Sequence, residues 1–419
     1  MQEQDIQLEM PDEFVRPNYL QGSIANIPAT VAALLDAPFE GLPPLPGALW
    51  RPLGGDVKRV VTFVVDGLGW NLLQQERPFL QPLLQQAKVE EQLTSIFPST
   101  TAAALSSLWT GVAPAQHSLV GLSLFFPEYG TIGQLLNFSP TFGRYPDALV
   151  EAGLSPEAFL QWPGLAQQLA SAGVPAHAFK GWGIVNSALS KMHGRGVAGN
   201  HGVTTLADML VQMRRLLEAT KGERLYAAAY WPTVDTLGHE YGWNDETVAA
   251  ELRSIVMQLQ TEFLDRLSEA ARRDTVLLIC ADHGQIVTPL VERIYIEDHP
   301  QLQQMLFMKA AGEPRVVYLY TKHGCQENVV TYINEHLGEA MIAWPASDIL
   351  GAGLLGPQPF DAATAERIGD VVVVMRGGHA LLDSRTNDQD FTSRMLGRHG
   401  GMTHAEMIVP WLGFRLDDM

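Results

Sequence analysis

Residues 59–69 read RVVTFVVDGLG, and this segment decides the fold class. An apolar, largely β-branched run that ends in Asp-Gly is typical of a strand buried on both faces of a sheet. Similar runs occur at 224–231, RLYAAAYW, and at 275–282, TVLLICAD, each after a helical stretch. Alternating strands and helices predict a three-layer α/β/α sandwich with a mostly parallel central sheet.

The chain divides into three parts by pattern. Residues 1–50 are rich in proline and polar residues and form an N-terminal arm. The α/β core spans 51–285 and 399–419, and a helix at 244–273 is expected within it because apolar residues recur at three-to-four spacing. Residues 286–398 contain two strand patterns around a helical one, which predicts an inserted smaller α+β cap lobe.

Composition restricts the classes of function. Hydrophobic residues make up 46% and charged ones 18% of 419 residues, as expected for a globular protein. The net charge of −18 argues against binding a nucleic-acid polymer. A small anionic substrate remains compatible, since bound divalent cations would reverse the local field.

The sequence also bears on location. The amino terminus is acidic and lacks the pattern of a secretory signal, and runs such as 60–65 and 371–374 are too short to cross a membrane. Cys280 and Cys325 are too few for a disulfide framework. We therefore expect a cytoplasmic protein without a membrane partner; its oligomeric state is unknown.

Polar residues follow the predicted strands. Asp66 ends the first, and the adjacent pair Asp282 and His283 ends the third. In the segment DTLGH, Asp235 and His239 are four residues apart, so one helical turn places both on one face, where they can hold one metal ion. Each residue alone is equally compatible with an ordinary turn, cap or helix surface.

A further histidine lies near the carboxyl end. His399 belongs to RHGGMTH, where two glycines let the backbone approach a ligand closely, and His404 could compete for its role. Three aspartates and three histidines supply ligands for two divalent cations, with open positions for substrate and water. Two such ions outweigh three carboxylates, and the resulting positive site favours a phosphate.

The nucleophile is sought among hydroxyls. The segment 97–111, FPSTTAAALSSLWTG, places Ser99, Thr100 and Thr101 immediately before an alanine-rich helical stretch. The positive end of a helix dipole favours an alkoxide and a bound phosphate. Ordinary helix capping explains such a threonine equally simply and is commoner.

Taken in order, VVDGLG, FPSTTAAALSSLWTG, DTLGHEYG, ADHG and RHGG resemble the alkaline phosphatase superfamily. The nearest branch is the type I phosphodiesterase and nucleotide pyrophosphatase family. The resemblance extends over most of residues 59–414 and leaves the first 50 unexplained. It implies a metal-dependent phosphoric ester hydrolase that acts on a small phosphorylated substrate.

The resemblance also implies roles for individual residues. The family's nucleophile precedes by ten residues the glycine of a TG pair, which selects Thr101 over its neighbour Thr100. One metal ion would be held by Asp235, His239 and His399. The second would be held by Asp66, Asp282 and His283, with Thr101 bridging toward phosphate. Family members commonly use zinc, which suits this ligand set, and manganese is also compatible.

One position departs from the family pattern. Nucleotide pyrophosphatases carry a phosphate-binding Asn in a GN pair, and the matching pair here is Gly121-Leu122. We hypothesise that basic or polar residues of the segment 179–196 reach the pocket instead, with a solvated loop as the alternative; the candidates are Lys180, Asn186, Lys191, His193 and Arg195. Alternative functions are a phosphomonoesterase or phosphomutase, or a non-catalytic metal-binding regulator.

Overall fold

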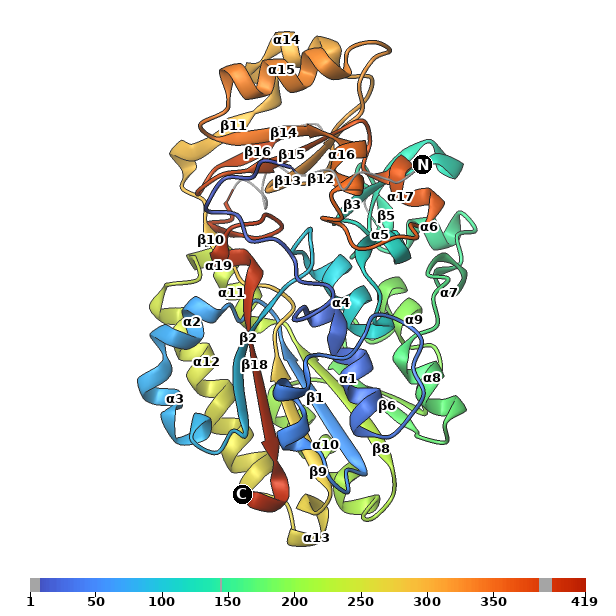
Figure 1. The fold of residues 1–419 in the computed structure, drawn as a ribbon, viewed down its shortest axis with the longest axis vertical. Coiled ribbons are helices and arrows are strands. Elements are labelled where there is room, and N and C mark those ends of the chain that lie inside the picture. Colours follow the sequence, from blue (N-terminus) through green and yellow to red (C-terminus); the bar gives the residue numbers. More distant parts are fainter. Residues whose placement is uncertain (1–7, 144, 384–393) are drawn as a thin grey trace.

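The computed structural model describes residues 8–143, 145–383 and 394–419. A seven-stranded sheet forms the centre of its larger part (Figure 1). All strands are parallel except β18, which runs antiparallel to both neighbours. The order across the sheet is β2 (Val89–Thr94), β18 (Ile408–Arg415), β9 (Thr275–Cys280), β1 (Arg59–Val65), β8 (Leu225–Trp231), β6 (Ala176–Gly181) and β7 (Gly199–Val203).

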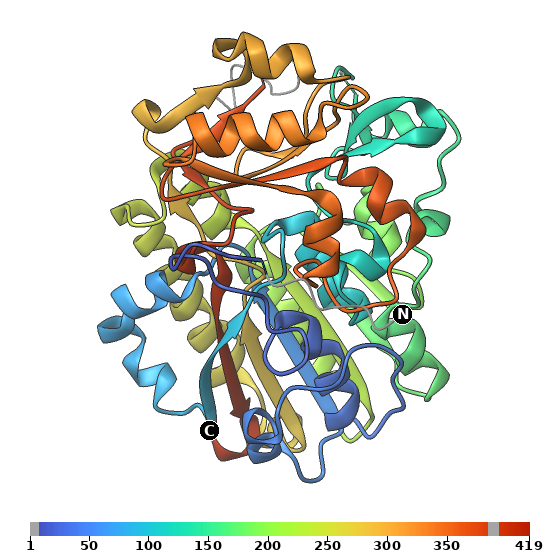
Figure 2. The ribbon, with the colours of Figure 1, turned by 45° about the horizontal axis from the view of Figure 1, so that its top comes forward.

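Helices cover both faces of this sheet (Figures 1 and 2). One layer contains α1 (Ile27–Leu34), α4 (Thr101–Thr110) and α8 (Leu165–Ser171), which contact one another. The other contains α3 (Arg77–Leu84), α10 (Leu206–Ala219) and α12 (Glu246–Gln258). Strand β1 is buried along its whole length, as its unbroken apolar run requires. The predicted three-layer α/β/α sandwich is therefore confirmed.

The second sheet lies above the first in Figure 1 and is antiparallel. Its order is β14 (Met341–Pro345), β15 (Val371–Met375), β13 (Val316–Leu319), β12 (Ala311–Glu313), β3 (Ser123–Phe126), β4 (Thr131–Gln134) and β5 (Ser139–Pro140). Two short pairs accompany it: β10 (Ile286–Val287) with β17 (Gly397–Arg398), and β11 (Arg293–Tyr295) with β16 (Ala380–Leu382).

The remaining helices are short or peripheral. Those near the main sheet are α2 (Trp70–Gln75), α9 (Ala188–His193), α11 (Thr233–Tyr241) and α13 (Glu269–Arg272). Those associated with the second sheet or its connections are α5 (Pro114–His117), α6 (Ala148–Glu151), α7 (Pro156–Phe159), α14 (Pro300–Met305), α15 (Gln326–His336), α16 (Ala346–Gly351), α17 (Ala362–Arg367) and α19 (His404–Met407).

The second sheet extends beyond the 286–398 segment expected for the cap lobe. Strands β3, β4 and β5 come from residues 123–140, which the sequence pattern placed in the core, and β3 pairs with β12 across the register Gly312↔Ser123. Local periodicity carries no information about pairing between segments so far apart. The expected N-terminal arm is also well packed, since Ile27, Val31 and Leu34 of α1 belong to the main core.

The long helix expected at 244–273 is shorter in the structure. Helix α12 ends at Gln258, a π turn and a 3-10 turn follow, and Leu267 is extended. Ser268 then caps α13 through a hydrogen bond from the Ala271 N–H to its side chain. A serine that favours a cap thus interrupts an otherwise helical pattern.

The apolar cores link the two sheets. One cluster contains Phe97 and Ala102, which flank the start of α4, together with Val316, Tyr318 and Val372 of the second sheet. The second sheet therefore shares an apolar cluster with the segment that carries Thr101. None of the helices within the described ranges has both the length and the apolar character needed to cross a membrane.

Candidate active site

The site lies where parallel strands of the main sheet end. Asp66 follows β1, Asp282 and His283 follow β9, and α11, which carries Asp235, begins just after β8. Strands β9 and β8 are the two neighbours of β1 in the sheet, so their carboxyl ends meet. Ligand crevices form at such edges, because side chains there are not committed to the sheet.

The first cluster joins helix α11 to the loop after β17. Asp235 Oδ2 lies 3.3 Å from His239 Nε2, and Asp235 Oδ1 lies 3.6 Å from His399 Nε2. The two imidazole Nε2 atoms are 3.3 Å apart. Asp235 and His239 are one helical turn apart, as the spacing predicted. Their ligand atoms converge within 4.8 Å, which is compatible with one shared metal ion.

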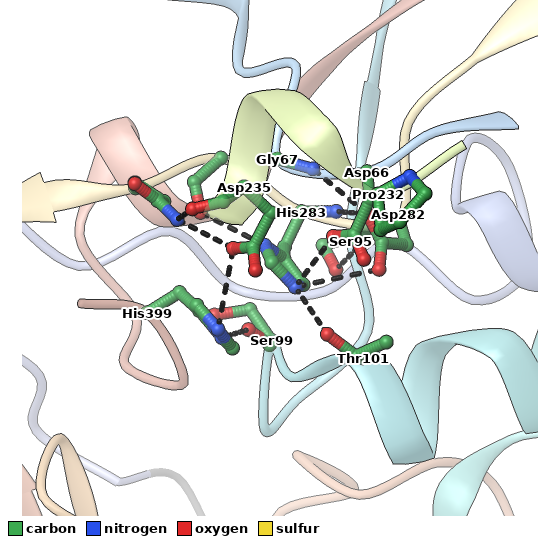
Figure 3. Close-up of polar contacts among 12 residues, drawn as sticks. Asp66, Gly67, Ser95, Ser99, Thr101, Pro232, Asp235, Asp282, His283 and His399 are labelled. Atoms are coloured by element: carbon green, nitrogen blue, oxygen red, sulfur yellow. Dashed lines mark hydrogen bonds and ion pairs between the residues drawn. The ribbon is translucent and has the colours of Figure 1, made fainter. Parts of the chain in front are cut away.

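The second cluster surrounds His283 (Figure 3). His283 Nε2 lies 3.5 Å from Asp66 Oδ1 and 3.3 Å from Asp282 Oδ2. Asp235 also has an oxygen within 4.8 Å of the ligand atoms of Asp66 and His283. Asp235 therefore lies between the two clusters, a position that the division into two separate triads did not anticipate.

The three imidazoles present the same nitrogen to the site. Each Nδ1 lies beside a backbone carbonyl: His239 at 2.8 Å from Gly397 O, His283 at 3.0 Å from Gly284 O, and His399 at 3.1 Å from Ser99 O. A carbonyl only accepts, so it favours a proton on Nδ1 and leaves the Nε2 lone pair free. This arrangement suits metal ligands.

The carboxylates need compensating charge. Burial, followed by repulsion from Asp282 and Asp235, raises the pKa of Asp66 well above its ordinary value. Burial likewise raises the pKa of Asp282. Asp66 Oδ1 and Asp282 Oδ2 are buried and have no hydrogen-bond donor among the described residues. Buried carboxylates of this kind fit divalent cations, which would stabilise their ionised forms.

Asp235 behaves differently from the other two carboxylates. Although burial alone would raise its pKa, the charge of His239 and the hydrogen bond between them lower it. Burial would lower the pKa of His239, but Asp235 outweighs it and raises that pKa. Burial and the neighbouring His283 hold the pKa of His399 well below its ordinary value. His399 is thus suited to remain a neutral ligand.

Two site residues were missed by the sequence analysis. Tyr230, near the end of β8, donates its hydroxyl hydrogen bond to Asp66 Oδ2. Gln285 Nε2 donates to the backbone oxygen of Asp235 at 3.0 Å and also to its Oδ1. Both orient carboxylates rather than form part of the clusters. Gln285 lies only two residues after His283, which is the one local signal that could have drawn attention to it.

Thr101 faces the second cluster from the first turn of α4. Its Oγ1 lies 3.1 Å from His283 Nε2. Thr100 is the N-cap residue, but its side chain forms no capping hydrogen bond. The Ser99 hydroxyl is already engaged, because its Oγ donates to Gly401 O at 2.8 Å in the loop that carries His399. Of the three candidate hydroxyls, the one selected by the family spacing thus contacts a site histidine. The free N–H groups of the first turn of α4 suit a bound phosphate.

Other candidate residues lie elsewhere. His404 is exposed at the start of α19. In the segment expected to reach the pocket, Asn186 and Lys191 are exposed and Arg195 donates to backbone carbonyls of Met192, Glu157 and Trp162. Lys180 contacts Ser190 and the ring of Trp109, and His193 contacts Ser106. Lys180 and His193 thus contact side chains of α4, Arg195 is engaged by backbone carbonyls, and the other two candidates are exposed. None of these five described residues is seen to contact the two clusters, so the hypothesis that they bind phosphate is not supported.

Comparison with known structures gives the same fold. Murine ectonucleotide pyrophosphatase/phosphodiesterase 5 matches with a TM-score of 0.62 and 17% identity, covering 85% of this chain and 87% of that one. Phosphonoacetate hydrolase from Sinorhizobium meliloti 1021, in complex with phosphonoformate, matches with a TM-score of 0.61 and 17% identity, covering 85% and 93%. An inactive form of the murine protein in complex with AMP gives 0.60 at 17% identity, covering 85% and 88%.

Sequence comparisons assign the chain to a family. No match was found among curated proteins. A family model, however, matches residues 60–402, a span that contains all six candidate aspartate and histidine ligands and Thr101. The chain therefore belongs to the type I phosphodiesterase / nucleotide pyrophosphatase family of phosphoester hydrolases.

Proposed function

We propose that the protein is a two-metal phosphodiesterase that acts through a covalent phosphothreonine at Thr101. The observation that carries this proposal is the convergence of Thr101 Oγ1, three imidazole Nε2 atoms and three carboxylates at one edge of the main sheet. A nucleophile beside a dense set of metal ligands is what phosphoryl transfer requires.

The ligands divide between two ions with Asp235 between them. Asp235, His239 and His399 would hold one, and Asp66, Asp282 and His283 the other. Nitrogen and oxygen donors in this ratio suit zinc, and manganese is the alternative. Bound cations would lower the pKa of the Thr101 hydroxyl and offset the charge that develops on the phosphoryl oxygens.

The chain's own residues define the course of the reaction. Thr101 Oγ1 gives up its proton to solvent and forms a bond to phosphorus, while the bond from phosphorus to the leaving oxygen breaks and that oxygen takes up a proton from solvent. Water then attacks the same phosphorus, the bond from phosphorus to Thr101 Oγ1 breaks, and the Thr101 hydroxyl and a phosphate monoester are released. The first-turn N–H groups of α4 are placed to hold non-bridging oxygens, and Tyr230 and Gln285 fix the carboxylates during both steps.

Hydrolysis of bis-p-nitrophenyl phosphate by zinc- or manganese-loaded protein tests the proposal. Thr101→Ala should lower turnover by at least about 1,000-fold, the scale for loss of a covalent nucleophile, while metal content persists. Thr100→Ala should keep substantial activity. Acid quenching during turnover should leave one p-nitrophenyl phosphoryl group on the peptide that contains Thr101.

Three outcomes would contradict the proposal. If Thr101→Ala keeps its activity and Thr100→Ala loses it, the nucleophile is Thr100 and not Thr101. Absence of activity in fully loaded wild-type protein would remove the catalytic assignment. Fewer than about one tightly bound cation per chain would favour a non-catalytic role.

A further inference from the structure

Glu313, the last residue of β12, is a buried carboxyl at the junction of the second sheet and the candidate active site. Its exposed fraction is 6%. The side chain lies against Gly400, where an added Cβ would be 2.7 Å from Glu313 Cδ. Gly400 directly follows His399 in the chain and pairs with Ser99 through a backbone hydrogen bond of 3.1 Å. The Glu313 carboxyl therefore packs against the pairing of Ser99 with Gly400. This pairing joins the segment just before Thr101, here called the nucleophile loop, to the loop that carries His399.

The neighbours of Glu313 lie at the same place. The Thr100 side chain and the Leu122 backbone lie close enough to favour the ionised form of the Glu313 carboxyl, and Thr100 immediately precedes the proposed nucleophile. Its Oε1 is buried and has no hydrogen-bond partner within the part of the chain that the structure describes. A buried oxygen without a donor is unfavourable unless something outside the protein engages it or its charge serves a function.

The charges around Glu313 do not neutralise it. Glu406 lies near enough to oppose its ionisation, His239 favours ionisation, and the Tyr318 phenol is a further buried neighbour. In the described residues, no lysine or arginine forms an ion pair with it. Burial raises the pKa of Glu313 to about 8, so the carboxyl is ionised at pH values above this. Cations bound in the two neighbouring clusters would extend its ionised range downward.

We propose that Glu313 is a specificity-determining residue that makes the site favour phosphodiesters over phosphomonoesters. This proposal rests on the function proposed above. A phosphomonoester carries a second negative charge on its phosphoryl oxygens, whereas a diester has a neutral ester oxygen in that place. A carboxylate beside the nucleophile loop opposes the second charge and leaves the singly charged diester less affected, because like charges repel most strongly at short range in a poorly solvated site.

The test compares two ligands and two substrates at about pH 9, where the carboxyl is ionised. Binding of orthophosphate and of dimethyl phosphate to zinc-loaded protein is measured by calorimetry. Hydrolysis of p-nitrophenyl phosphate and of its bis ester gives the ratio of kcat/KM values. Glu313→Gln removes the charge and keeps the shape and an acceptor for Thr100. It should increase affinity for orthophosphate by about tenfold or more and change that for dimethyl phosphate by less than about threefold. The monoester-to-diester ratio of kcat/KM should rise by a similar factor.

Control variants make the outcome specific. Glu90→Gln removes a carboxylate that pairs with Arg77 on the main sheet, away from the site. It should leave the ratio of the two affinities and the monoester-to-diester ratio of kcat/KM unchanged. If Glu313→Gln does not fold, Glu313→Met, which is apolar and similar in size, takes its place with the same expected shift. If the monoester-to-diester ratio of kcat/KM in the folded variant stays within about twofold of the wild-type ratio, this inference is overturned. Hydrolysis by the wild-type protein would still support the function proposed above. A wild-type protein that hydrolyses neither substrate would instead overturn the function proposed above.

Discussion

At the residue scale, the candidate site is defined by buried carboxylates that lack enough protein donors. Asp66 receives the Tyr230 hydroxyl hydrogen bond on one oxygen only, and its other oxygen faces His283. Asp282 accepts the N–H groups of Gly67 at 3.2 Å and of His283 at 3.0 Å through one oxygen, which leaves its second oxygen for another partner. Each carboxylate is thus oriented by the protein and keeps one oxygen that a cation could engage.

Stability of the metal-free protein should depend on pH through Asp66. Its folded-state pKa is raised, so above about pH 4 the unfolded chain loses this proton before the folded chain does. The folded state then holds more protons, and the stability contribution is lost as pH rises through the raised pKa. In chelator, wild type should lose stability relative to Asp66→Asn with increasing pH, by about 2 kcal/mol.

Thermal unfolding of both proteins from about pH 5 to about pH 8 measures this difference. Zinc should abolish it in wild type, since a bound cation stabilises the ionised carboxylate, and Asp66→Asn should bind less zinc. Parallel pH profiles in chelator would show that Asp66 is already ionised without metal and that repulsion among the carboxylates is relieved in some other way.

At the element scale, the site depends on how closely the turn after β1 approaches α11. Gly67 has φ of +73°, and a Cβ there would lie 2.8 Å from Asp235 Cα and 3.0 Å from Asp235 N. The Asp235 N–H donates to Asp66 O at 3.1 Å, so this contact holds the two carboxylate-bearing segments together. Only glycine allows both the left-handed backbone and the close approach.

Gly67→Ala should therefore weaken metal binding as well as folding. The left-handed conformation alone costs about 1–2 kcal/mol for alanine, and the clash with α11 adds to it and separates Asp66 from Asp235. Gly173→Ala is the matched control, because Gly173 has φ of +72° and open space around its Cα. Both variants should be destabilised, but only Gly67→Ala should lose zinc affinity in calorimetry. Equal zinc affinity in the two variants would contradict a role for this contact.

How far the sequence predicts these elements depends on the range of the interactions. Asp66, Asp282 and His283 could be located because each follows an apolar run that is readable within ten residues, and Thr101 because family spacing counts from Gly111. The strand β3 and the residue Glu313 could not, because their partners lie far away in the chain. The same holds for the carbonyls that fix the imidazoles, such as Ser99 O for His399, 300 residues apart.

At the scale of the whole molecule, the second sheet supports the loop that carries His399. Arg315, between β12 and β13, donates to Glu406 of α19 through Nε at 2.9 Å and Nη2 at 2.8 Å, and both side chains are fully buried. Glu406 also accepts the Gly401 N–H at 2.9 Å and the Thr403 hydroxyl at 2.6 Å. A single carboxylate therefore links the second sheet to the turn that immediately follows His399, a candidate metal ligand.

Breaking this pair should affect both stability and the site. Arg315→Met leaves Glu406 buried and unpaired, which should destabilise the fold by about 3–5 kcal/mol, whereas adding Glu406→Gln removes the uncompensated charge and should recover much of that loss. Denaturant unfolding followed by tryptophan fluorescence and circular dichroism measures both. Because one apolar cluster contains Phe97 and Val316, the two signals should coincide in a single transition. Separate transitions would mean that the second sheet folds independently of the edge of the main sheet that carries the site. A double variant as unstable as Arg315→Met would mean that the second sheet does not position His399 through Glu406.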